Sequence, residues 1–224
     1  MSREKSAVQS EDGRYVERAL GVLKNYPRDG ADLRACSDQY VGLIESLRTS
    51  SDFPVRFPAS QRPSNQHCVL LILESPHRQE FLPPDADPKP ANGQTGKNIR
   101  TYFSAVEGLQ GLGNYGLILV NAVQYQCSRG EDPLPRSKTD SIFRELWLAG
   151  GEQDLTLRLR KLALKDDIVV NACVSGKSNS PKKSLRGLVQ TAVEQADFGL
   201  PVLHSFHPSW WHVVSRRKRR KPPY

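Results

Sequence analysis

Four short apolar runs, and the segments between them, restrict the fold of this chain more than any other feature. The runs span residues 68–74, 115–122, 166–174 and 200–206. Their apolar residues are continuous rather than alternating, as expected of strands buried on both faces of a parallel sheet. Stretches at 96–109, 136–150, 154–164 and 184–197 have apolar residues three and four positions apart, which predicts helices between the strands. The pattern predicts an α/β fold with three layers, a four-stranded parallel sheet with helices on both faces.

The rest of the chain is divided by its local composition. Two more helices are predicted ahead of the first apolar run, at 14–26 and 33–50, and a Pro- and Ser-rich loop follows at 51–66. A length of 224 residues suits one α/β domain. We therefore expect a disordered N-terminus over residues 1–14, a single domain over 15–214 and a basic tail over 215–224.

Composition excludes several classes of protein. Apolar residues make up 38% of the chain, enough for a core, but no run approaches the ~18 consecutive apolar residues that span a bilayer. The charged N-terminus has no apolar segment typical of a secretory signal. The four cysteines form no Cys-x-x-Cys pair, and Cys68 and Cys173 belong to apolar runs, so we expect buried thiols rather than disulfides or a metal cluster. The expected protein is cytoplasmic and monomeric, with no membrane, obligatory protein partner, metal or cofactor.

A block of six basic residues, 216–221, accounts for six of the eight net positive charges. Such a block is attracted to polyanions, meaning nucleic acid or anionic lipid. No amphipathic helix or lipidation motif accompanies it, which favours nucleic acid, with contacts expected from Arg216, Arg217 and Lys218. Nuclear import is the other interpretation of the block, so a nuclear location stays open beside a cytoplasmic or, in a bacterium, nucleoid-associated one.

Polar residues follow each of the four predicted strands. The first run ends in Glu74-Ser75-Pro76-His77, the second in Asn121, the third in Ser175-Gly176-Lys177, and the last in the segment HSFHPSWW over 204–211. In open α/β sheets the ligand site lies beyond the carboxyl ends of the strands. These groups are therefore expected to meet at one edge of the sheet. The alternative is that they are ordinary polar loop residues.

These motifs together resemble the uracil-DNA glycosylase superfamily, over roughly residues 66–214. LESPH, over 73–77, is similar to the family's first motif, which takes forms such as GEAPG. LILVNAV, over 117–123, is similar to the family strand whose terminal Asn reads the flipped base. NGQTGKNI, over 92–99, is similar to the Gly-x-x-Gly stretch before the first crossover helix. HPSWW, over 207–211, is similar to HPSPL, whose last residue wedges into the duplex.

The resemblance implies a monofunctional DNA glycosylase that hydrolyses the N-glycosidic bond of a flipped-out base and leaves an abasic site. Glu74 would stabilise the positive sugar and orient water, and His207 would donate a hydrogen bond to the departing base. Ser75, Pro76, His77 and Asn121 would hold the base. Trp211 would fill the vacated stack, with Trp210 beside it. The other expected DNA contacts are Gly96, Lys97, Ser175, Gly176, Lys177 and Ser209.

Two departures from the family pattern predict a wide base pocket. His77 stands where the uracil-specific branch has a Tyr, and Ala91 or Asn92 stands where an aromatic residue stacks on the base. Both changes favour a base with a bulky C5 group, as in the anti-phage branch that excises glucosylated hydroxymethylcytosine. The alternatives are an ordinary uracil-DNA glycosylase of DNA repair, a catalytically silent DNA-binding module of the same fold, and a hydrolase of free nucleosides or nucleotides.

Overall fold

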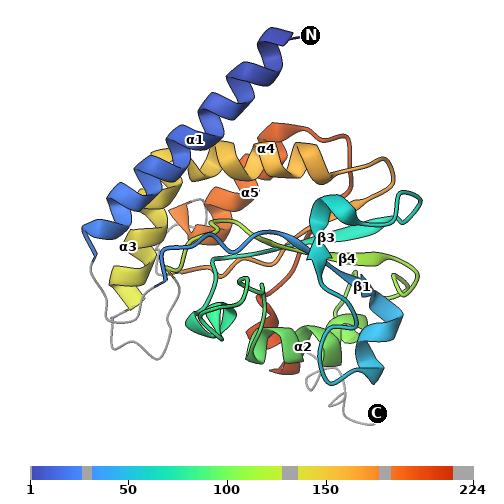
Figure 1. Ribbon diagram of the computed structural model, residues 1–224. Helices are drawn as coiled ribbons and strands as arrows, with labels where there is room; N and C mark the ends of the chain where they lie inside the picture. The colour runs from blue at the N-terminus through green and yellow to red at the C-terminus, as the bar shows by residue number, and fades with distance from the viewer. Residues whose placement is uncertain (1, 27–31, 128–135, 177–182, 214–224) are drawn as a thin grey trace.

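The computed structural model describes residues 2–26, 32–127, 136–176 and 183–213. At its centre is a mixed six-stranded sheet with the order β2-β1-β4-β3-β5-β6 (Figure 1). The strands are β1 (Gln39–Leu43), β2 (Phe57–Pro58), β3 (Cys68–Leu73), β4 (Gly116–Asn121), β5 (Ile168–Asn171) and β6 (Val202–His204).

The four predicted strands are confirmed as β3, β4, β5 and β6, and they pair in parallel. The prediction of a purely parallel, four-stranded sheet is wrong, because β1 is antiparallel to β4 and β2 is antiparallel to β1. The predicted helix over 33–50 is also wrong, since this segment contains β1 and a 3₁₀ helix, η1 (Ile44–Thr49). As a strand, the segment can bury Tyr40 and Val41 in the cores on opposite faces of the sheet.

The predicted helices of the strand region are confirmed, with shifted ends. They are α2 (Gln94–Tyr102), α3 (Arg136–Leu146), α4 (Glu152–Leu162) and α5 (Leu185–Ala196). A π-helical turn, η5 (Trp147–Gly151), joins α3 to α4. The first helix, α1 (Ser2–Lys24), begins at Ser2, where we expected disorder up to residue 14. Among the described helices, none is both long and apolar enough to cross a membrane.

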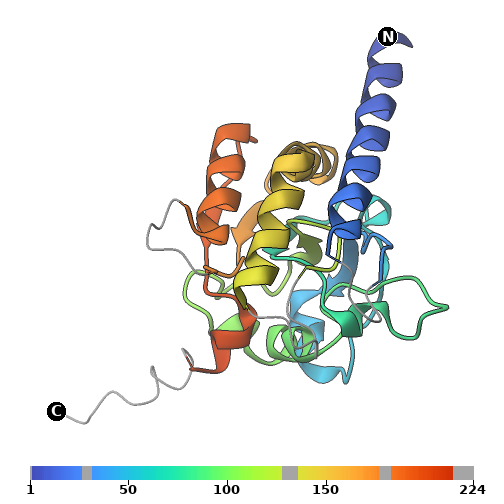
Figure 2. The same ribbon diagram turned by 90° about the vertical axis from the view of Figure 1, so that its left-hand side faces the viewer.

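The core has two parts, one on each face of the sheet. Alternate residues of β3 divide between them, with Leu70 and Ile72 on one face and Val69 and Leu71 on the other. Helices α1, α3, α4 and α5 cover the first face, and α2 and η1 cover the second (Figures 1 and 2). Both faces of the central strands are therefore buried, which explains why their apolar runs do not alternate. All four cysteines are buried thiols, as predicted for Cys68 and Cys173.

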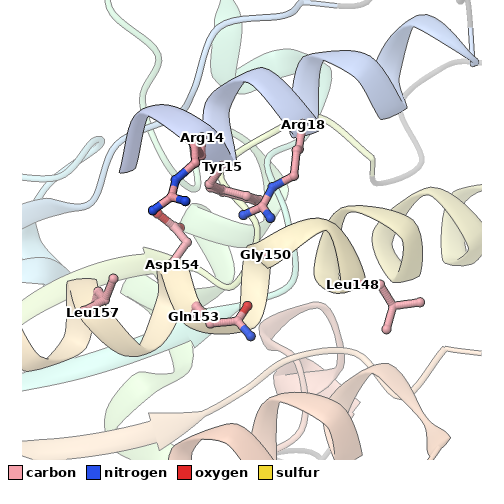
Figure 3. A pocket seen from close by; sticks show the side chains of 8 residues that line it. All are labelled: Arg14, Tyr15, Arg18, Leu148, Gly150, Gln153, Asp154 and Leu157. Atoms are coloured by element: carbon pink, nitrogen blue, oxygen red, sulfur yellow. The ribbon is translucent and has the colours of Figure 1, made fainter. Parts of the chain in front are cut away.

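A cavity of about 300 Å³ lies where α1 packs against η5 and α4 (Figure 3). Arg14, Tyr15 and Arg18 of α1 line it on one side, and Gly150, Gln153 and Asp154 lie opposite. The Tyr15 ring is buried and meets Tyr125 edge to face at a centroid distance of 6.1 Å. None of the residues that line this cavity belongs to the predicted site.

Candidate active site

A second cavity, of about 350 Å³, lies at the carboxyl ends of β3, β5 and β6. Its wall carries three carboxyl groups, two imidazoles and four hydroxyls beside two apolar side chains. The lining residues are Leu73, Glu74, Ser75, His77, Glu80, Thr95, Thr139, Asp140, Val174, His207 and Ser209. The fold thus brings Glu74, Ser75, His77, His207 and Ser209 to one place from distant parts of the sequence.

The loop after β3 is held against the end of β4 by backbone hydrogen bonds. The Ala122 and Val123 amides donate to the carbonyls of Leu73 and Glu74, at 3.0 and 3.1 Å. The hydroxyl of Ser75, which is buried, donates to Glu74 Oε1 at 3.4 Å. Glu74 itself is half-buried at the wall of the cavity. This carboxylate is therefore fixed from two strands and still reaches the open space.

His77 begins the next turn of the loop. Its Nδ1 accepts a hydrogen bond from the Gln79 amide at 3.2 Å and so caps the 3₁₀ helix η3 (Arg78–Phe81). That short helix turns Glu80 back into the cavity wall. Pro76 is buried and does not line the cavity.

His207 lies at the opposite wall and has one ring nitrogen already engaged. The Ser209 amide donates to its Nδ1 at 3.3 Å, and Ser209 Oγ lies 2.9 Å from the same atom. Because Nδ1 accepts the amide proton, the neutral ring carries its own proton on Nε2. Burial, with Arg186 nearby, lowers the pKa of His207 to about 4. At neutral pH the ring is therefore an uncharged hydrogen-bond donor.

The turn that carries His207 is held against α2 by a hydrogen bond. Pro208–Trp210 forms the 3₁₀ helix η7, with His207 as its N-cap. The side-chain amide of Asn98, on α2, donates to the Pro208 carbonyl at 3.0 Å. Thr95, from the first turn of the same helix, lines the cavity. Helix α2 thus positions both the turn and part of the wall.

Asn121, the predicted base reader, lies behind the wall rather than in it. It is 1% exposed, and its Nδ2 donates to Glu80 Oε2 at 3.5 Å. Its Oδ1 is buried with no hydrogen-bond partner among the described residues. Glu80, not Asn121, is the member of this pair that lines the cavity.

Sequence reasoning missed Glu80. Glu80 is 5% exposed, and burial raises its pKa to about 7, although hydrogen bonds from the His77 backbone, the Asn121 side chain, the Ala91 backbone and the Cys36 thiol oppose the rise. The Cys36 thiol lies 3.7 Å from Oε2. The only local signal is the spacing of His77 and Glu80, three residues apart, which resembles a helix-capping pattern. Burial of this carboxyl group depends on the packing of distant segments and is not visible in that spacing.

A buried arginine fixes the end of β4 from the helix layer. Both oxygens of Asp38 accept from Arg158 Nη1, at 2.8 and 2.7 Å, and Asp154 accepts from Nε at 2.8 Å. Its Nη2 donates to the carbonyls of Asn121 and Ala122, at 3.0 and 3.2 Å. The guanidinium therefore holds the strand end that supports Glu80. In the sequence, Arg158 is one of several charged residues on α4 and has no distinguishing pattern.

The two tryptophans have opposite environments. Trp211 is 1% exposed, packs edge to face on Phe103 at 5.8 Å, and donates from Nε1 to the Phe206 carbonyl at 2.7 Å. Its predicted role as a wedge is therefore wrong, because its ring is part of the core beneath the sheet. Trp210 is 60% exposed, and Phe206, the residue before His207 in the chain, is 57% exposed. Arg186 lies 5.6 Å above the Phe206 ring.

The remaining predicted DNA contacts lie in three kinds of place. Gly96 is buried in α2, where a Cβ atom would lie 2.0 Å from the Ala91 carbonyl oxygen, so close packing accounts for the glycine. Lys97 and Ser175 are exposed, and Gly176 has a φ of +67° beside Leu185 and Asp140. Outside the described residues lie Lys177, Arg216, Arg217 and Lys218.

No group of His, Cys, Asp or Glu side chains within the described ranges is placed to hold a metal ion. The cavity wall offers carboxyl groups, imidazoles and hydroxyls at fixed positions, which suits proton transfer and hydrogen bonding to a substrate. The chain matches no protein-family model and no curated protein.

Proposed function

We propose that the chain is a DNA glycosylase that hydrolyses the N-glycosidic bond of a flipped-out pyrimidine and leaves an abasic site. One observation carries the proposal. A fixed carboxylate, Glu74, and a neutral imidazole, His207, line one cavity at the carboxyl ends of parallel strands. The motifs that supply them are the ones that resemble the uracil-DNA glycosylase superfamily.

The reaction needs opposite charges stabilised at its two ends. As the bond breaks, positive charge develops on the sugar and negative charge on the departing base. The Glu74 carboxylate stabilises the sugar and takes a proton from the attacking water, while His207 donates from Nε2 to an oxygen of the base. A donor that is already neutral loses no proton at physiological pH, so the low pKa of His207 suits this role.

The cavity wall favours a base larger than uracil. Among the described residues, no Phe, Tyr or Trp lines the cavity, and His77 occupies part of the wall. Hydroxyls of Thr95, Thr139 and Ser209 can hydrogen-bond a polar substituent. We therefore include in the proposal a pyrimidine with a bulky, polar C5 group, such as a glucosylated cytosine.

DNA, rather than a free nucleoside, fits the surface around the cavity. Phe206, directly before His207 in the chain, and Trp210, three residues after it, both expose large rings, and a small substrate requires neither. Exposed aromatic rings stack on unpaired bases. In this proposal Trp210, rather than Trp211, fills the space that the flipped base leaves in the stack. The basic block at 216–221 would add sequence-independent phosphate contacts.

The test is base release from a panel of duplex oligonucleotides that carry uracil, cytosine, 5-methylcytosine, 5-hydroxymethylcytosine or its glucosylated form. The natural protein should release at least one base, and Glu74→Gln and His207→Ala should each abolish most of that release. Glu17→Gln is the matched control, because Glu17 is exposed on α1. Binding of the DNA without release of any base would support a catalytically silent module instead. Undiminished release by the Glu74→Gln, His207→Ala double variant would also overturn the assignment.

A further inference from the structure

The cavity contains two glutamates in different environments. Glu74 is half-buried and accepts from the Ser75 hydroxyl. Glu80 is almost completely buried, and the side chains that bond to it, Asn121 and Cys36, are neutral. When two carboxyl groups share a site and their surroundings favour different protonation states, they commonly divide the roles of acid and base.

We propose that Glu80 is a second catalytic group, the acid that protonates the departing base, and that Asn121 and Cys36 are the positioning residues that orient it. This proposal rests on the proposed function and adds a proton donor to it. Asn121 and Cys36 both lie against Oε2, so they fix one carboxyl oxygen of a side chain that lines the cavity. Asn121 is in turn held by Arg158 through its carbonyl.

The charges around Glu80 permit it to hold a proton near neutral pH. Cys36 stays a thiol, because burial raises its pKa. Arg56 is the nearby cation that favours the ionised form, but it is itself engaged with Asp52, Gln39 and the Pro90 carbonyl. Around the cavity, Glu80 shares the wall with Glu74, His77, Asp140 and His207. The balance leaves Glu80 with a pKa of about 7.

The step balances in atoms and charge. The bond between C1′ and the base nitrogen breaks, and its electron pair passes to the base ring. The Glu80 proton moves to a ring nitrogen of the base, which leaves as a neutral molecule. Water adds to C1′ and gives one proton to Glu74. That proton returns through solvent to Glu80, so both glutamates end as they began.

This acid matters most for a cytosine-type base. Cytosine has an unprotonated ring nitrogen, N3, that can take a proton, and its anion is a poor leaving group. Uracil carries hydrogen on N3 and leaves more readily as an anion, for which the His207 hydrogen bond is enough. The substrate class therefore narrows to pyrimidines with an amino group at C4.

The first test is the pH dependence of single-turnover cleavage of a cytosine-type substrate. Because Glu80 acts in its protonated form, the rate of the natural protein should fall as pH rises through about 7. Glu80→Gln keeps the shape of the side chain but cannot give a proton. The cleavage rate of this variant should be about 10²- to 10⁴-fold lower at pH 6, and its pH profile should have no inflection near 7. Glu17→Gln should behave like the natural protein.

The second test separates proton donation from a structural role. 5-Fluorocytosine is a better leaving group than 5-methylcytosine, so Glu80→Gln should lose less on the fluorinated substrate, by roughly tenfold or more. Asn121→Ala removes a donor to the carboxylate and should move the inflection to higher pH. Thermal unfolding checks that each variant is folded.

The outcomes distinguish failure of the proposed function from failure of the role proposed for Glu80. If the natural protein releases no base from any substrate, the proposed function fails and this proposal with it. If the natural protein is active and Glu80→Gln keeps its rate within about threefold, or keeps the inflection near 7, the proposed function stands and Glu80 is not the acid. An equal loss on both leaving groups likewise overturns the role of Glu80 as proton donor.

Discussion

Replacing each tryptophan in turn should separate stability from DNA chemistry. Trp211 is 1% exposed, meets Phe103 edge to face and donates one N–H, from Nε1, that is shared between the Phe206 carbonyl and Ser205 Oγ. Removing a buried ring of this size costs about 3–5 kcal/mol. For a chain of this length each kcal/mol lowers Tm by about 2–4 °C, so Trp211→Ala should lower it by roughly 6–20 °C.

Trp210→Ala should have the opposite profile. Its ring is 60% exposed, so the change in Tm should stay within a few degrees. If the ring fills the stack that the flipped base leaves, its removal takes away about 1–3 kcal/mol of stacking. Cleavage of duplex DNA should then fall roughly 5- to 100-fold, with little change on single strands.

The two assays are thermal unfolding and single-turnover cleavage, run on both variants and on both strand types. A matched pair of adjacent residues makes each variant the control for the other. If Trp210→Ala lowers Tm as much as Trp211→Ala, the two rings do not differ in their contribution to the core. The wedge assignment is refuted if Trp210→Ala slows single-stranded and duplex cleavage equally.

Four further predictions concern the packing, the charges and the basic block. Arg158→Met leaves Asp38 buried without its partner and should destabilise the protein by about 3–5 kcal/mol in urea unfolding; a change below about 1 kcal/mol would contradict the role of Arg158 as the support of β4. Gly96→Ala forces a Cβ atom against the Ala91 carbonyl and should cost about 1–3 kcal/mol, whereas Gly21→Ala on α1, with open space around it, should be neutral or stabilising. Glu80 binds its proton more tightly in the folded state, so its contribution to stability should decline as pH rises from about 5 through 7, and Glu80→Gln should remove that decline in urea titrations. Deleting residues 216–221 should weaken DNA binding and reduce its salt dependence by up to ~0.9 log unit of slope for each phosphate that the block neutralises; an unchanged slope would assign the block to something else.

The parallel strands were predictable because burial on both faces requires a continuous run of apolar residues, which is visible in the local sequence. Each of β3 and β4 is a run of six buried residues, so the apolar stretch in the sequence and the strand in the fold nearly coincide. Strand β1 has no such continuous apolar run. Its apolar residues Tyr40, Val41 and Leu43, with Ile44 and Leu47 after them, also fit the spacing of a helix. What makes it a strand is pairing with β4, which lies far away along the chain.

The candidate site was predictable where its residues directly follow strands and not where packing decides. Glu74 directly follows β3, and His207 was found from the HPSWW motif in the segment that follows β6. Glu80 was missed because its burial arises from contacts with Asn121 and Cys36, which no local pattern encodes. Adjacent tryptophans likewise give no sign of which ring turns inward. The helical turn at 208–210 directs Trp211 to the core and leaves Trp210 outside.

The central claim is that this chain breaks the bond between a pyrimidine and its sugar in DNA. The most direct measurement is free base released by the full-length natural protein, quantified by mass spectrometry beside the abasic sites formed in the same duplex. A DNA glycosylase of this kind should yield equal amounts of both, with a C5-substituted cytosine released faster than plain uracil. DNA that is bound but stays intact for every base in the panel would contradict it.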